Sequence, residues 1–489
     1  MKINRYISVA FMVIILSMSS CDSFLDDQPR GNAIAETTDH YNGLFNTITF
    51  MNMTMADYTH WLIDQIQLTP ECIVNFPTTI TNYDQYSAER AFRYQKDVYK
   101  VTENCTAWER CYKNIYTYNV IANEVMNSSD GTEMKKKAIQ AEARVSCAWM
   151  HFILAQLFSK PYNANNADTE LTIPIVKDAN SNEKSFERAT MKDLYHFIIT
   201  EMEESCPELE DRKDHNMRIY KTTGYALLGK MYWMMGEYEK ALGPLRMAYE
   251  RLKNETDFYI LDFNALQEKY GYRELTLEEL SDEEQMMPNY LLPYTYANPE
   301  FLWVKQNTFL GVFYIAYFDI AIYYLKKECY DLFDDNDLRR NLIPTKDKNG
   351  TPYPYPVGCI RDKTTNYGVE IPEVYLALAE CEARVGSENS AKELLVEFRK
   401  YRMLTGHEGI PGTVHTKDDL IKFCIEEEDR EFMGREQRYY NLRRLWNDPL
   451  FQNQKPITHN DGTAIYTMQE DNLYLQLPES VLKWNEKWR

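Results

Sequence analysis

The stretch TTGYALLGKMYWMMGEYEKALGPLRMA, residues 222–248, decides the fold of this chain. Its aromatic, apolar and small residues recur at helical spacing on either side of a break at Gly236. Gly229 and Ala241 have side chains small enough for two helices to approach closely, and Gly236 is placed to end the first helix. The stretch therefore predicts two antiparallel helices packed as a hairpin. The residues that form this pattern are Tyr225, Leu228, Gly229, Tyr232, Gly236, Tyr238, Ala241, Leu245 and Ala248.

The same template recurs near the C-terminus when it is started at Pro372. It matches Tyr375, Leu378, Ala379, Gly386, Ala391, Leu395 and Phe398. Two units in one register are typical of the tetratricopeptide repeat (TPR), whose period is about 34 residues. A generic helical hairpin is the alternative interpretation. Further helices are predicted over Thr106–Met126, Glu133–Phe158 and Met191–Met202, the last with Thr190 as its N-cap.

Between the two repeat units the helical period is lost. Residues 257–370 contain proline- and tyrosine-rich runs such as PYTYANP at 293–299 and TPYPYP at 351–356. Long tracts of this kind, inserted into a regular scaffold, commonly carry binding function. The predicted fold is mostly α, a TPR-like helical-repeat scaffold with a large irregular, loop-rich insertion. Its expected parts are residues 1–20 (signal peptide), 21–40 (flexible tether), 41–256 (N-terminal helical half), 257–370 (ligand-binding insertion) and 371–489 (C-terminal TPR-like unit and closing helix).

The N-terminus has the pattern of an export signal. Lys2 and Arg5 precede an apolar run over residues 7–16, and small residues precede Cys21. The run is too short to span a bilayer, which takes about 20 apolar residues. A cysteine after two small residues resembles a bacterial lipobox, so Cys21 is expected to carry the lipid anchor. An ordinary secreted protein is the alternative.

Composition and motifs narrow the function classes. The net charge of −20 disfavours nucleic acid as a partner. The ten cysteines are scattered, and Cys147, Cys381 and Cys424 are expected to be buried thiols. We find no zinc-site spacing, P-loop or dinucleotide fingerprint, so no metal or cofactor is predicted. Nothing in the sequence sets two carboxylates at the separation that a glycosidase needs. No enzyme activity is predicted.

Several longer motifs resemble the SusD/RagB family of outer-membrane nutrient-binding lipoproteins over nearly the whole chain. They are Phe24-Leu25-Asp26 after the lipobox, Trp108-x3-Tyr112-x2-Ile115-x3-Asn119, Ile173-Pro174-Ile175-Val176, Tyr330-Asp331-Leu332-Phe333, the helix expected over Glu427–Arg444, and Tyr474-Leu475-Gln476-Leu477-Pro478. In the 427–444 helix, Glu428 and Arg435 depart from the usual family residues by a charge swap. Because seven residues separate them, they would share one helix face and could pair.

The resemblance implies a protein without catalytic activity at the surface of the outer membrane. It implies that the chain binds an oligosaccharide, or in some members of the family a peptide, and delivers it to a SusC-like TonB-dependent transporter. Two alternatives from other classes are a lipoprotein glycoside hydrolase and a TPR scaffold that binds a periplasmic protein or peptide.

Tyrosine dominates the aromatic residues, with 37 Tyr against 21 Phe and 8 Trp. Aromatic rings stack on the apolar faces of sugars, and polar side chains bond the hydroxyl groups. Two tracts outside the repeats have this mixture and are expected to contact the ligand. The expected contacts are Trp61, Tyr83, Tyr86 and Arg90 in the first tract, and Tyr294, Tyr296, Asn298 and Trp303 in the second. The alternative for each aromatic residue is simple packing, which we assign to Trp108, Tyr112, Tyr225 and Tyr232.

Overall fold

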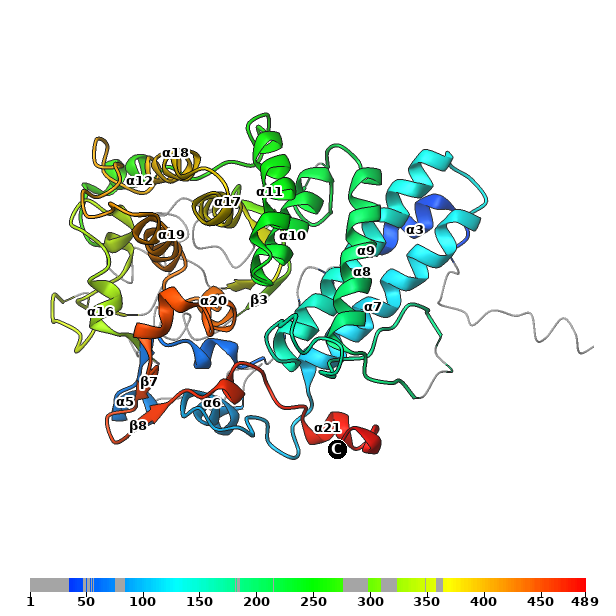
Figure 1. Ribbon diagram of the computed structural model, residues 1–489, viewed down its shortest axis with the longest axis horizontal. Helices are drawn as coiled ribbons and strands as arrows, with labels where there is room; N and C mark the ends of the chain where they lie inside the picture. Colours follow the sequence, from blue (N-terminus) through cyan, green and yellow to red (C-terminus); the bar gives the residue numbers. More distant parts are fainter. Residues whose placement is uncertain are drawn as a thin grey trace, which may run out of the picture.

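The computed structural model describes residues 35–46, 50, 53, 55, 57–74, 84–180, 182, 185–213, 215–275, 298–308, 323–347, 349–357 and 364–489. Helices dominate these residues, and the strands occur in short pairs (Figure 1). The mostly helical fold is confirmed. Cys21, Tyr83, Tyr294 and Tyr296 lie outside the described residues.

Both predicted repeat hairpins are present. The first consists of α10 (Lys221–Met234) and α11 (Tyr238–Leu252), and the second of α17 (Ile371–Val385) and α18 (Glu388–Arg399). Gly236 ends the first helix with a φ of 75°, a conformation that glycine adopts at little cost. A Cβ atom on Gly229 would lie 2.6 Å from the Leu245 side chain, so the close approach of α10 and α11 requires glycine. Helix α11 also packs on α17, which joins the two repeat units into one scaffold (Figure 1).

The N-terminal half forms a second layer of long helices. Helices α7 (Thr106–Glu124), α8 (Glu133–Phe158) and α9 (Met191–Ser205) pack in sequence, and α3 (Thr38–Leu44) lies against α7 and α8. The N-cap prediction is confirmed, because the Thr190 side chain accepts a hydrogen bond from the backbone of Asp193. Short 3-10 turns follow α7 and α9, at Val125–Asn127 and Cys206–Glu208. Helix α3 begins within the segment predicted as a tether.

Short strands pair within the insertion, and one pair joins it to the N-terminal half. All three pairs are antiparallel: β1 (Ile66–Gln67) with β4 (Tyr324–Leu325), β2 (Phe301–Trp303) with β6 (Val369–Glu370), and β3 (Gln306–Thr308) with β5 (Thr364–Asn366). The other regular elements of the insertion are α12 (Phe263–Tyr270), α16 (Lys327–Tyr330) and a 3-10 helix at Leu338–Leu342. Strand β6 leads directly into α17, so the insertion ends where the second repeat begins.

The predicted helix over Glu427–Arg444 is wrong as a single element. It is two helices, α19 (Lys417–Glu431) and α20 (Gln437–Leu445), because Gly434 between them adopts a φ of 73°. The remaining elements are short, and several of them lie along the lower edge of Figure 1, as does the C-terminus. They are η1 (Thr59–Leu62), α5 (Pro70–Val74), α6 (Gln85–Phe92), η6 (Pro449–Gln454), β7 (Thr458–Asn460), β8 (Ile465–Thr467), η7 (Glu470–Asn472), α21 (Glu479–Leu482) and η8 (Glu486–Trp488).

Buried ion pairs connect α19 and α20 to the insertion and the repeats. The Glu427 carboxylate forms ion pairs with Arg339 and Arg399, each at 2.6 Å, and with Arg430 at 3.0 Å. Burial alone would raise the pKa of the Glu427 carboxyl, but these three guanidinium groups lower it well below its usual range.

The proposed pair between Glu428 and Arg435 is wrong, because each has another partner. Arg435 lies 2.6 Å from Glu370 at the start of α17, and Glu428 lies 3.9 Å from Arg444. The helix break at Gly434 removes the shared face on which the prediction depended. The charge-swapped residues therefore belong to a network of long-range ion pairs.

All eight described cysteines are free, and seven of them are buried. Cys147, Cys381 and Cys424 are among the buried ones, so their predicted role as small apolar core residues is confirmed.

Candidate functional site

The first predicted tract forms a polar and aromatic surface on α6, which we call the α6 patch and define as Asp84, Tyr86, Arg90 and Lys100. Asp84 caps the helix by accepting hydrogen bonds from the backbone of Tyr86 and Ser87. Tyr86 is 49% exposed, and one helical turn later the Arg90 guanidinium lies 5.3 Å from its ring centre and donates to its hydroxyl at 3.2 Å. Lys100 Nζ lies 5.6 Å from the same ring and 2.8 Å from Asp84. Aromatic, cationic and acceptor groups thus meet at the surface.

Buried residues hold the α6 patch in place. The Tyr58 hydroxyl donates to the Glu103 carboxylate and accepts from the backbone N–H of Asp84 at 3.0 Å. Ser87 donates to the other oxygen of Glu103 at 2.6 Å. Burial and the neighbouring Glu103 charge raise the pKa of Tyr58 far above its ordinary value, so the phenol stays a donor. The helix start that carries Tyr86 is therefore fixed before any ligand binds.

The two predicted tryptophans are buried. Trp61 is 0% exposed and packs edge-on against Tyr323, with 6.1 Å between ring centroids. Trp303 is 1% exposed, and its indole N–H donates to the Met217 carbonyl at 3.3 Å. Neither ring offers a face to a ligand in this structure, so burial favours the packing interpretation for both. Asn298 is also buried, and its side chain accepts from the Glu300 backbone in a turn. Tyr86 and Arg90 are the predicted contacts that the described structure brings together at the surface.

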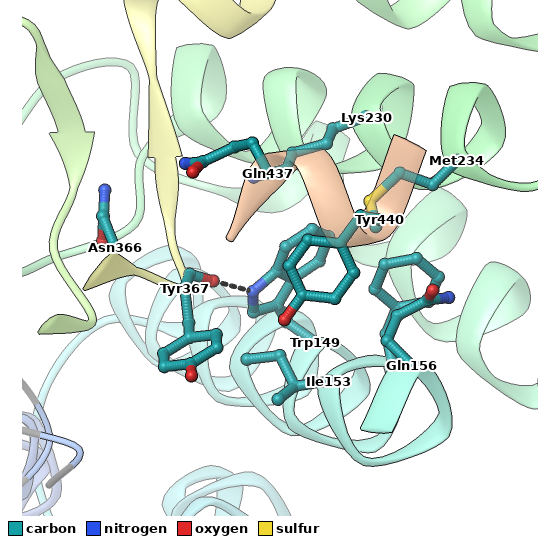
Figure 2. Close-up of a pocket in the computed structure, with 10 residues that line it drawn as sticks. Trp149, Ile153, Gln156, Lys230, Met234, Asn366, Tyr367, Gln437 and Tyr440 are labelled. Atoms are coloured by element: carbon teal, nitrogen blue, oxygen red, sulfur yellow. Dashed lines mark hydrogen bonds between the residues drawn. The ribbon is translucent and has the colours of Figure 1, made fainter. Parts of the chain in front are cut away.

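A small chamber lies between α8, α10 and α20 (Figure 2). Figure 2 shows Trp149 in the lining of the chamber, where its indole N–H donates to the Tyr367 carbonyl at 2.7 Å. The chamber measures about 30 Å³. One water molecule takes about 10–15 Å³ on this measure, so the chamber has room for about two waters and is too small for a sugar ring.

The carboxyl groups whose pKa values are raised most lie in the core. Burial raises the pKa of Asp57 to about 7, of Glu428 to about 8 and of Asp429 to about 6. A general acid needs such a value, but it must also reach the substrate, and all three are buried. Described residues form three pockets, and across the three linings the single carboxylate is that of Asp178. Among the described residues, no group of three or more metal-ligating side chains is arranged to hold an ion.

A groove on α7 escaped the sequence analysis. Trp108 and Tyr112, which we assigned to packing, are only half-buried and line this groove of about 310 Å³ together with Tyr116. The signal that could have found it is the spacing of four residues between successive rings, which places all three on one helix face.

The comparisons with known proteins agree with this architecture. A family model described as "Starch-binding associating with outer membrane" matches residues 23–233, and a model of the SusD family matches residues 371–487. Together these segments span more than half of the chain. The chain belongs to the SusD/RagB family. No protein with a curated description matches it.

Solved structures share the fold. A SusD superfamily protein from Bacteroides vulgatus has a TM-score of 0.67 at 15% identity, over 93% of this chain and 98% of that one. A SusD-like carbohydrate binding protein from the same species has a TM-score of 0.62 at 13% identity, covering 92% and 97%. Surface glycan-binding protein A from Bacteroides uniformis has a TM-score of 0.61 at 15% identity, covering 91% and 98%. At these identities the likeness establishes the fold alone. No helix among the described residues is long and apolar enough to cross a membrane.

Proposed function

We propose that this protein is a lipoprotein of the outer membrane that binds an oligosaccharide at the cell surface and passes it to a SusC-like TonB-dependent transporter. Cys21 would carry the lipid anchor. The observation that carries the proposal is the pair of family models, because they match both ends of the chain and one is described by starch binding and association with the outer membrane.

The chemistry of the α6 patch supports an oligosaccharide as the ligand. The exposed Tyr86 ring provides an apolar surface of the kind on which sugar C–H groups rest. The Arg90 and Lys100 N–H groups can donate to hydroxyl oxygens, and the Asp84 carboxylate can accept from hydroxyl hydrogens. Tyr83, Tyr294 and Tyr296 remain proposed contacts from the two predicted tracts.

Co-purification tests the delivery step. An affinity tag inserted after Gly412, in the exposed loop between α18 and α19, leaves both chain ends unaltered. Gentle extraction of the full-length protein from its native host should yield a TonB-dependent barrel in near-stoichiometric amount. Recovery of the protein alone, or with a periplasmic enzyme, contradicts the proposal.

Binding is measured on the full-length protein in detergent by its retardation in native gels that contain starch, xylan or a β-glucan. Release of reducing ends from a retarding polysaccharide, abolished by a single Asp or Glu substitution, would instead establish the hydrolase alternative. Protection of the protein from protease added to whole cells, together with no retardation, would establish the periplasmic scaffold alternative.

A further inference from the structure

We propose that the groove on α7 is a binding site for a short, uncharged oligosaccharide, separate from the α6 patch. The inference rests on the proposed function for its ligand class, while the site itself follows from the groove. The groove is lined by Trp108, Tyr112, Tyr116, Pro174, Val176, Asp178, Asn180, Phe186, Asn485 and Trp488.

The floor of the groove is a row of aromatic rings. Trp108, Tyr112 and Tyr116 follow one another at steps of four residues, which corresponds to a rise of about 6 Å per step along a helix. Tyr116 is 43% exposed, whereas Trp108 and Tyr112 are half-buried. The rings of Trp108 and Tyr112 lie 4.9 Å apart at an angle of 51°. The row can therefore support an extended ligand along the helix.

One wall of the groove is bonded to the floor by side chains of α7. The Tyr112 hydroxyl donates to the Pro174 carbonyl at 2.9 Å, and Asn119 donates to the Val176 carbonyl at 2.9 Å. Asn123 donates to the Lys177 carbonyl at 3.3 Å. These bonds fix residues 174–177 over the helix, so this wall exists without a ligand.

The C-terminal segment forms a second wall. Trp488 packs against Trp108, with ring centroids 6.1 Å apart. Lys487 bonds to Ser185 at 3.1 Å and forms an ion pair with Glu187, which ties the C-terminus to the wall that contains Phe186. A site built before binding loses less conformational entropy when its ligand arrives.

The polar groups of the groove suit hydroxyl groups better than charges. Asp178 and Asn180 are exposed on one wall, and Asn485 lies on the other. The Trp488 indole N–H is buried and has no hydrogen-bond partner within the described part of the chain. Asp178 is the charged residue of the lining, and it is negative in a protein of net charge −20, which disfavours acidic ligands.

The same features argue against other occupants. A wholly apolar ligand would remove the Asp178 carboxylate from water without pairing it. A peptide that binds by adding a strand to a sheet edge finds no such edge here, because the floor is a helix whose backbone is bonded within itself. A sugar has both an apolar face for the rings and hydroxyl groups for the polar side chains. The volume of about 310 Å³ lies at the lower end of small-ligand sites, which suits a short oligosaccharide.

Two tryptophans of the C-terminal segment provide a matched pair of variants. Trp488 lines the groove, while Trp484 is 77% exposed and outside the lining. Binding of maltoheptaose, xylohexaose, laminarihexaose and the acidic tetragalacturonate to the full-length protein is measured by titration calorimetry. For the neutral oligosaccharide that binds, we expect Trp488→Ala and Tyr116→Ala to weaken the groove site about tenfold, and Trp484→Ala to leave it unchanged.

The outcomes separate the two proposals. If Tyr116→Ala and Trp488→Ala bind like the unaltered protein while Tyr86→Ala does not, the groove site is overturned and the proposed function stands. If the unaltered protein binds no glycan, by calorimetry or in the polysaccharide gels, the proposed function fails and the groove assignment fails with it. Tighter binding of tetragalacturonate than of the neutral chains overturns the ligand class. Trp488→Ala also removes the packing of Trp488 on Trp108. Tyr116→Ala is therefore the control for folding: if its melting temperature is unaltered, its lost affinity does not come from a loss of fold.

Discussion

Arg402 offers the sharpest test of how the insertion is held to the helical scaffold. Its guanidinium is fully buried and bonds to both oxygens of Glu431 at 2.9 Å, to Glu300 at 2.6 Å and to the Leu261 carbonyl at 2.7 Å. Glu300 and Leu261 belong to the insertion, whereas Glu431 ends α19. We expect Arg402→Met, which keeps most of the side-chain volume, to destabilise the protein strongly because two buried carboxylates lose their shared partner.

The magnitude follows from the burial of the pair. Removing one partner of a buried ion pair costs about 3–5 kcal/mol, since the other charge stays in the core. Glu431 keeps a bond to Arg339 at 3.2 Å, which places the expected loss near the lower end, about 3 kcal/mol. The free energy of unfolding is measured by urea denaturation at pH 7. The midpoint of the urea transition should fall by this loss divided by the measured slope of the transition.

Two controls show whether the effect comes from buried charge. Lys192 pairs with Asp168 at 2.7 Å, but their side chains are 64% and 72% exposed, so Lys192→Met should cost less than about 1 kcal/mol. The double variant Arg402→Met/Glu431→Gln should be more stable than the sum of the two single variants predicts, because it removes a stranded charge. A loss below about 1 kcal/mol in Arg402→Met would refute the reasoning.

Three further predictions concern packing and titration. Gly229→Val should cost about 1–3 kcal/mol by forcing α10 away from Leu245, whereas Gly243→Ala, with open space around it in α11, should stabilise by about 0.5–1 kcal/mol in the same urea assay. Burial lowers the pKa of His151 from 6.5 to about 4, so the unfolded chain takes up the proton first and stability should fall as pH drops from 6.5 to 4. The loss of unfolding free energy between these pH values that comes from His151 is about 3 kcal/mol, and it should be missing in His151→Gln. Equal slopes of unfolding free energy against pH in the two proteins would contradict this assignment. Trp61→Ala should lower the free energy of unfolding by about 3–5 kcal/mol and leave the glycan affinity of the folded protein unchanged. A loss of affinity without a loss of stability would instead identify Trp61 as a ligand contact.

The parts of the fold that could be predicted from the sequence are those fixed by neighbours along the chain. The repeat hairpins depend on Gly229, Gly236 and their helical spacing, and the bounds of α8 depend on its periodic apolar residues. The break between α19 and α20 was missed, although Gly434 is a stop signal. The spacing of Glu428 and Arg435 predicts a shared helix face, but their actual partners are Arg444 and Glu370.

The candidate site was harder to predict because exposure is a tertiary property. Trp61 and Tyr86 lie in one tract of similar composition, yet the fold buries the first and exposes the second. The α7 groove needs walls from residues 174–180, Phe186 and residues 485–488, which no local pattern connects to Trp108. Sequence reasoning could therefore name the kind of residue that binds a sugar, but not which aromatic rings face the solvent.

The buried ion pairs attach the insertion to the helical scaffold. The insertion contributes Glu300 and Arg339 to the network, and the C-terminal region contributes Arg402, Glu427 and Glu431. Replacing such pairs with apolar residues is often neutral or stabilising in other proteins, so net stability alone does not account for them. Their geometry does, because a guanidinium bonds a carboxylate in few orientations. The network thus fixes the position of the insertion on the helices.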